Sequence, residues 1–165
     1  MADWKDNEEV LPALLDRLTD EEPQNRNEGR LPRAQVVRSL KKSLRRDLEW
    51  LLNTRSSIED PEDWMKEVQY SLQQYGLPDL TTYSLAASRD QGLLAHLLEE
   101  AIAKFEPRLS NVIVSMVPIA GTNRVLKFQI EGILLIDTGP ERIQFDTTLE
   151  LASGSYTVEG GAGAG

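Results

Sequence analysis

The spacing of hydrophobic positions along this chain changes near residue 107. Before that point, apolar side chains recur every three or four residues, which is typical of amphipathic helices. Beyond it, apolar and polar side chains alternate, which is typical of strands with one buried face. This order predicts an α+β domain, in which N-terminal helices pack on one face of a C-terminal three- to four-stranded antiparallel meander.

Two long segments carry the helical spacing. The first covers residues 34–53, and the second runs from Ser88 to Phe105 and ends before Pro107. Ser88 and Gln91 have the spacing of a capping box at the start of a helix. The expected buried stripes are Val37, Leu40, Leu44, Leu48, Trp50, Leu51 and Leu52 in the first segment, and Leu94, Leu97, Leu98, Ala101, Ile102 and Phe105 in the second.

A weaker helical pattern lies between these two segments. It consists of Trp64, Val68 and Leu72, and it stops at Gly76 and Pro78. Glycine suits the left-handed backbone that ends many helices, and proline cannot continue one. We therefore expect a short third helix that ends just before Gly76.

Three segments after Pro107 have the period of strands. They cover residues 111–117, 125–136 and 143–151, and residues 156–158 can add a short edge piece. Gly132 marks a bulge or a close backbone contact in the second segment. The last four residues of that segment are all apolar, so burial on both faces is expected there.

The two ends of the chain differ from its centre. Residues 1–33 are predicted to be an N-terminal arm, in which a short amphipathic helix ends near Thr19 and precedes a polar linker. This helix can fold back on its own domain or dock on a partner, and the sequence leaves both open. Residues 34–158 are predicted to be a single domain, and residues 159–165 a flexible glycine-rich tail.

The charge of the chain argues against some classes of binding partner. The formal net charge is −9, which argues against binding to nucleic acid or to an anionic membrane surface. No apolar run is long enough to span a membrane, and the acidic start lacks the apolar core of a secretory signal, so a cytoplasmic protein is expected. Basic residues nevertheless cluster between Arg30 and Arg46. Such a cluster is most often a solvated helix face, and a docking surface for an acidic partner is the alternative.

Candidate catalytic residues are few. The chain has no cysteine, and His96 is its only histidine, so neither a zinc site nor a catalytic triad is expected. No glycine-rich loop suggests a nucleotide, and we expect no cofactor and no small-molecule substrate. A muramidase needs two carboxylates that flank a sugar cleft, and Glu106 with Glu131 is the most plausible pair. A small adaptor of another complex is a further alternative.

Several segments, taken in order, resemble one known family. They are LLDRLT (14–19), RDLEWLLNTR (46–55), YGLPDL (75–80) and EPRL (106–109), followed by the closing meander of residues 128–136 and 143–151. In this order and spacing the chain resembles the TssE family of type VI secretion baseplate subunits. It is similar, more distantly, to the lysozyme-like wedge proteins of phage tail baseplates.

The resemblance implies a structural role without enzymatic activity. Such subunits pack beside a bundle of helices from larger wedge proteins, and they help to initiate the first ring of sheath subunits. Their central interaction site maps onto Glu106, Pro107 and Arg108 of this chain. The likeness also implies that a strand edge accepts a segment of a sheath subunit. Either 111–117 or 143–151 is the expected open edge, and charged residues suited to guarding an edge are Asp146, Glu150 and Arg142.

Simple electrostatics also singles out two of these residues, Glu106 and Arg108. Glu106 is expected at the C-terminal end of a helix, where a negative charge opposes the helix dipole. Arg108 is a natural partner for it, and an exposed pair of this kind contributes about 0–1 kcal/mol. On this basis, Arg108→Ala is expected to leave the monomer folded and to weaken assembly.

Overall fold

The protein is described by a computed structural model. The residues that it describes are 14–19, 32–56, 66–69, 71–79, 88–118, 125–136 and 139–160. The helical elements, in chain order, are α1 (Leu14–Leu18), α2 (Arg33–Asn53), α3 (Lys66–Gln69), the 3₁₀ turn η2 (Leu72–Gln74) and α4 (Ser88–Phe105). The strands are β1 (Leu109–Val117), β2 (Val125–Leu134), β3 (Glu141–Glu150) and β4 (Ser155–Gly160). Helices precede strands, and the predicted α+β class is confirmed.

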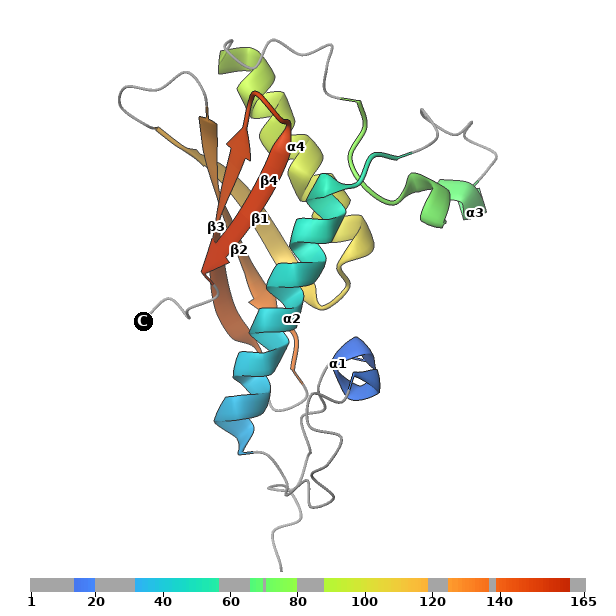
Figure 1. The fold of residues 1–165 in the computed structure, drawn as a ribbon, viewed down its shortest axis with the longest axis vertical. Helices are drawn as coiled ribbons and strands as arrows, with labels where there is room; N and C mark the ends of the chain where they lie inside the picture. The colour runs from blue at the N-terminus through green and yellow to red at the C-terminus, as the bar shows by residue number, and fades with distance from the viewer. Residues whose placement is uncertain are drawn as a thin grey trace, which may run out of the picture.

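The strands form one antiparallel sheet in the order β1-β2-β3-β4, so each pairs with its neighbour in the sequence. The long helices α2 and α4 lie side by side along one face of this sheet, as Figure 1 shows. In this layer α4 contacts β1 and α2 contacts β4. The short helix α3 lies away from the sheet (Figure 1).

The core lies between the two helices and the inner face of the sheet. Alternation holds in the strands, because Phe128 and Ile130 of β2 and Ile143 and Phe145 of β3 are buried while the residues between them are less so. The helices contribute Leu44, Leu48, Leu51, Leu52, Leu94, Leu98 and Ile102. Each leucine buried in this way stabilises the fold by about 1.5–3 kcal/mol.

Three apolar residues that were predicted to be buried are exposed. Trp50 is 54% exposed, because it falls about 200° around the helix from the buried Leu48. Leu135 is 55% exposed, because β2 ends at Leu134 and the outer face of the sheet carries no helical layer. Leu72 is 88% exposed, because its segment forms a 3₁₀ turn instead of extending α3.

The register break lies opposite Gly132, on the neighbouring strand. Ser110 pairs with Ile133 and Ile113 pairs with Glu131, so β1 contains one extra residue there. Asn111, in this bulge, has a positive φ of 50°. Gly132 lies against the bulge, where an added Cβ would be 3.5 Å from the carbonyl oxygen of Ser110. This is an ordinary van der Waals distance, so Gly132 marks no close backbone contact, and the bulge lies opposite it in β1.

The proposed open edge at residues 143–151 is wrong. This segment forms β3, which pairs with β2 on one side and β4 on the other. The predicted guards Asp146, Glu150 and Arg142 lie on β3 and therefore protect no edge. The edges of the sheet are β1 and β4, because residues 155–160 extend the predicted edge piece into a full strand.

Several predictions fall outside the described residues. These are the start of the N-terminal helix before Leu14, the linker at 20–29, Trp64, the side chain of Ser88 with its capping box, and residues 161–165. Strand β4 includes residues 159 and 160, which were assigned to the tail. The division into arm, domain and tail otherwise stays a prediction.

Candidate protein-binding site

The chain turns from helix to sheet at Glu106, Pro107 and Arg108, which we call the Glu-Pro-Arg corner. The amide of Glu106 still donates to the carbonyl of Ile102, at 2.8 Å, as in the last turn of a helix. Pro107 has no N–H with which to continue this pattern, and its side chain is exposed. Strand β1 begins two residues later at Leu109. The corner thus places Glu106 and Arg108 on either side of an exposed proline.

Glu106 and Arg108 form a bidentate ion pair. The Arg108 Nε lies 2.6 Å from Glu106 Oε1, and its Nη2 lies 2.5 Å from Oε2. The backbone amide of Arg108 also donates to Oε1, at 3.2 Å. These bonds raise the pKa of Arg108 above its usual value, chiefly through the hydrogen bond to Glu106, so Arg108 stays charged. Glu106 is only 5% exposed, so the value of about 0–1 kcal/mol for an exposed pair does not apply to it.

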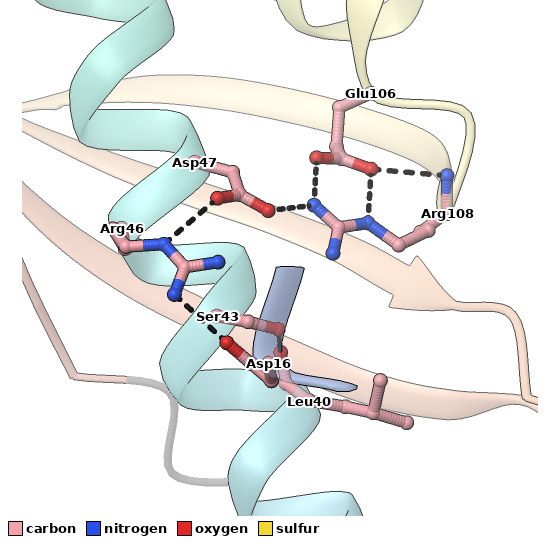
Figure 2. A network of polar contacts seen from close by, with 7 residues as sticks. All are labelled: Asp16, Leu40, Ser43, Arg46, Asp47, Glu106 and Arg108. Atoms are coloured by element: carbon pink, nitrogen blue, oxygen red, sulfur yellow. Dashed lines mark hydrogen bonds and ion pairs between the residues drawn. The ribbon is translucent and has the colours of Figure 1, made fainter. Parts of the chain in front are cut away.

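A third residue, Asp47 of α2, completes the site. The Arg108 Nη2 also donates to Asp47 Oδ2, at 2.7 Å, which joins α2 to the corner (Figure 2). The other oxygen of Asp47 accepts from Arg46 Nε, at 3.1 Å. Sequence analysis did not single out Asp47. The available signal was its place three residues after Leu44 and four before Leu51, where an acid interrupts an apolar stripe.

A shallow pocket of about 280 Å³ lies beside the ion pair. Its lining residues are Asp47, Leu51, Tyr75, Phe105, Glu106, Pro107 and Arg108. Tyr75 and Phe105 meet edge to face with their ring centroids 5.4 Å apart. Burial, together with the nearby carboxylates of Asp47 and Glu106, raises the pKa of Tyr75. An aromatic pair beside fixed charges suits a side chain of another polypeptide.

The structure does not bring the two candidate muramidase carboxylates together. Glu106 receives three hydrogen bonds from Arg108 at the end of α4. Glu131 is exposed on β2, next to the inward-facing Ile130, and therefore belongs to the outer face of the sheet. Within the described ranges, no group of three or more His, Cys, Asp or Glu side chains is placed to hold a metal ion. His96 lies on the surface of α4, 61% exposed, near Glu99 and Glu100.

Comparison with known protein families identifies the family of the chain. Residues 38–138 match the family described as baseplate wedge protein gp25. The chain belongs to this baseplate wedge family. The match extends from α2 through β2 and contains the whole Glu-Pro-Arg corner together with Asp47.

One solved structure is also similar to this wedge protein. It is a chain from "The baseplate complex from the type VI secretion system", with 22% identity and a TM-score of 0.47. The alignment covers 67% of this chain and 93% of the other. A comparison with curated proteins found no match. Among the residues that the structure describes, no helix is both long and apolar enough to cross a membrane.

The N-terminal helix of the wedge protein lies against α2. Arg46 Nη1 donates to Asp16 Oδ1 at 2.8 Å, so Asp16 and Arg46 extend the ion network away from the corner (Figure 2). The charges alternate along this network in the order Asp16, Arg46, Asp47, Arg108 and Glu106. Leu14, Leu15 and Leu18 of α1 remain exposed. One ion pair therefore joins this helix to α2 while its apolar residues stay exposed, and both alternatives for the helix, folding back and docking on a partner, stay open.

Both edges of the sheet are capped by side chains from the helices. At the β1 edge, the backbone amide of Val114 donates to Glu99 Oε1, at 2.8 Å. At the β4 edge, the Asn53 side chain accepts from the amide of Tyr156 and donates to its carbonyl, both at 2.8 Å. Glu99 and Asn53 therefore occupy backbone groups that another strand would otherwise use.

Proposed function

We propose that this chain is a non-enzymatic structural subunit of a contractile-injection baseplate wedge of the type VI secretion kind, acting in the cytoplasm. In this proposal the Glu-Pro-Arg corner binds the helical core formed by the larger wedge proteins. The observation that carries the proposal is the buried Glu106 carboxylate, which Arg108 and Asp47 lock to α2 beside a pocket. Membership of the baseplate wedge family supports it.

The physical advantage of this corner is preorganisation. Arg108 is already held by two carboxylates, and Pro107 restricts the backbone, so little conformational entropy remains to be lost on binding. Figure 2 shows the remaining terminal nitrogen of Arg108 pointing away from both carboxylates. This nitrogen carries two N–H donors, and the Arg108 side chain is 29% exposed, so a partner at the corner can accept hydrogen bonds from it.

Pro107→Lys tests this surface without disturbing the ion network. The side chain of Pro107 is exposed, so a lysine there leaves Glu106 and Arg108 in contact but projects into any partner at the corner. We expect recovery of the co-expressed wedge proteins in a pull-down to fall at least about tenfold, which corresponds to about 1.4 kcal/mol. We expect the melting temperature to change by less than about 2 °C, as for most surface substitutions.

The matched control is Pro118→Lys. Pro118 is also exposed, and it follows the far end of β1 from the corner. This variant should bind the wedge proteins like the wild type. Equal recovery of the Pro107 and Pro118 variants would show that the corner is not the binding surface.

We further propose that the β1 edge helps to initiate sheath assembly by accepting an extended segment of a sheath subunit. The edge presents backbone donors and acceptors, but Glu99 already occupies the amide of Val114. An incoming strand has to displace this carboxylate before it can pair with Val114. Glu99 is therefore expected to weaken strand addition and to limit it to the assembled baseplate.

Glu99→Ala should strengthen the binding of a sheath segment by about tenfold, because a charge-assisted hydrogen bond no longer has to be broken. The measurement is the affinity for purified sheath subunits, together with the rate of sheath nucleation on baseplates. Glu100→Ala is the matched control, because Glu100 is the next residue and its side chain is 63% exposed. If both variants resemble the wild type, the β1 edge is not the site of strand addition.

A further inference from the structure

Helix α2 carries its charges in the order that is unfavourable for an isolated helix. Its first fourteen residues contain six basic and no acidic residues, and its acidic residues, Asp47 and Glu49, lie nearer the C-terminus. No acidic residue occupies the first turn, and no basic residue the last. Helix dipoles favour the opposite arrangement. This dipole effect is confined to the first and last turns, so it disfavours Arg33 and is small for the basic residues in the middle of α2.

Three of these six basic residues are set aside. Two form ion pairs with other parts of the chain, and the side chain of the third is not described. Lys41 pairs with Glu141 of β3, and Arg46 pairs with Asp16 and Asp47. Arg33 begins the helix, and its side chain is not described. The other three are Arg38, Lys42 and Arg45, all exposed. Their spacing of four and three residues places them in one row along the helix, which we call the α2 basic row.

The α2 basic row makes no ion pair within the part of the chain that the structure describes. Lys42 follows Arg38 by four residues and precedes Arg45 by three, so each neighbouring pair repels. The row lies on an acidic protein with a net charge of −9. The chain has 27 acidic residues for 18 lysines and arginines, so carboxylates outnumber the basic side chains that they can pair with. Among the residues that the structure describes, the row is unpaired and self-repelling, which favours a role in binding a partner.

We propose that the α2 basic row binds an acidic segment of another baseplate protein. Arg38 to Arg45 spans about 10 Å of helix, so the matching segment is a helix of about eight residues with carboxylates one turn apart. Nucleic acid is a poorer match, because three cations neutralise few phosphates and the remaining negative charge of the chain repels the others. The contact rests on the proposed baseplate role, and its residues are separate from the Glu-Pro-Arg corner.

A matched pair of double variants tests the energetics. Lys42→Gln with Arg45→Gln removes two charges from the row, and Lys127→Gln with Arg142→Gln removes the same two residue types from exposed positions on the sheet. The first variant should lower incorporation into baseplates by about three- to tenfold at physiological salt. It should also raise the melting temperature of the free subunit by about 1–3 °C, because repulsion within α2 is relieved. The second should leave incorporation unchanged.

Photo-crosslinking in assembled baseplates identifies the partner. Gln35 is exposed one turn before Arg38, and a benzoylphenylalanine there should crosslink to a protein segment with at least about three acidic residues in one or two turns. Crosslinks to nucleic acid, to this chain itself, to a segment without carboxylates, or to nothing would overturn the inference, as would equal incorporation of the two double variants. Absence of the wild-type subunit from baseplates would instead overturn the proposed function, and this inference with it.

Discussion

Arg108→Ala is expected to lower the melting temperature of the subunit by about 5–10 °C. The substitution leaves the Glu106 carboxylate, only 5% exposed, without its cation and without the two hydrogen bonds from the Arg108 side chain, while the bond from the backbone amide of residue 108 remains. Removing one partner of a fully buried pair costs about 3–5 kcal/mol, and the 29% exposure of the Arg108 side chain reduces this to about 2–3 kcal/mol. For a domain of this size, each kcal/mol shifts the melting temperature by about 2–4 °C.

Two further variants separate charge from geometry at this site. Arg108→Lys keeps the charge but loses the planar fork, so an intermediate loss is expected. Replacing both partners, as Glu106→Leu with Arg108→Met, should recover most of the stability because no buried charge is left unpaired. A wild-type melting temperature for Arg108→Ala would contradict the buried state of Glu106.

The expected loss of stability makes Arg108→Ala unsuitable for measuring the binding contribution of the corner by itself. From the sequence, Arg108→Ala was expected to weaken assembly and to leave the monomer folded. With Glu106 buried, a loss of binding in that variant combines a lost contact with a less stable corner. Pro107→Lys leaves the ion pair in place, so it reports on the exposed surface and on the rigidity of the proline without unpairing Glu106.

Gly76→Ala is expected to have the largest effect on stability, with a loss of about 3–5 kcal/mol. Gly76 has a φ of +112°, and an added Cβ would lie 2.4 Å from the backbone oxygen of Thr54 at the end of α2. Backbone strain of about 1–3 kcal/mol and overpacking of similar size both contribute. Thermal denaturation should show a decrease of about 8–15 °C.

The close contact at Gly76 matters because it connects two segments of the core. The amide of Leu77 donates to the same Thr54 oxygen, at 2.8 Å, and Ser56 returns a bond to the carbonyl of Leu77, at 2.9 Å. These bonds hold Leu77 in the core, where it is fully buried. A side chain at position 76 would separate the two segments and expose Leu77.

Two glycines serve as controls for this prediction. Gly139 also has a positive φ, +127°, but no atom lies within 4 Å of its virtual Cβ, so alanine there adds strain without a clash. Gly92 lies in α4 with open space around it, and alanine should stabilise that helix by about 0.5–1 kcal/mol. Equal losses at positions 76 and 139 would show that the contact with Thr54 is unimportant.

Local sequence patterns were sufficient to predict most of the fold. The repeat of apolar residues at three and four positions predicted α2 to within one residue of its start, and alternation predicted the strand character of β2 and β3. The pairing of Glu106 with Arg108 was also predictable, because the two residues lie only two positions apart. Each of these features depends on side-chain direction, which the periodicity of the backbone determines.

The tertiary structure decided which residues are buried, which strands form the edges of the sheet, and which residues far apart in the sequence make contact. Leu135 is exposed and Glu106 is buried because helices cover only one face of the sheet, and the sequence does not specify what covers a residue. Asp47 reaches Arg108 from 61 positions away, a contact that exists only once α2 has packed beside α4. The pairing of β4 with β3 likewise determined which strands form the edges. Interactions between residues close in the sequence thus determined the helices, the strands and the pairing of the charges at the corner. Packing between distant elements determined which of those charged side chains became buried.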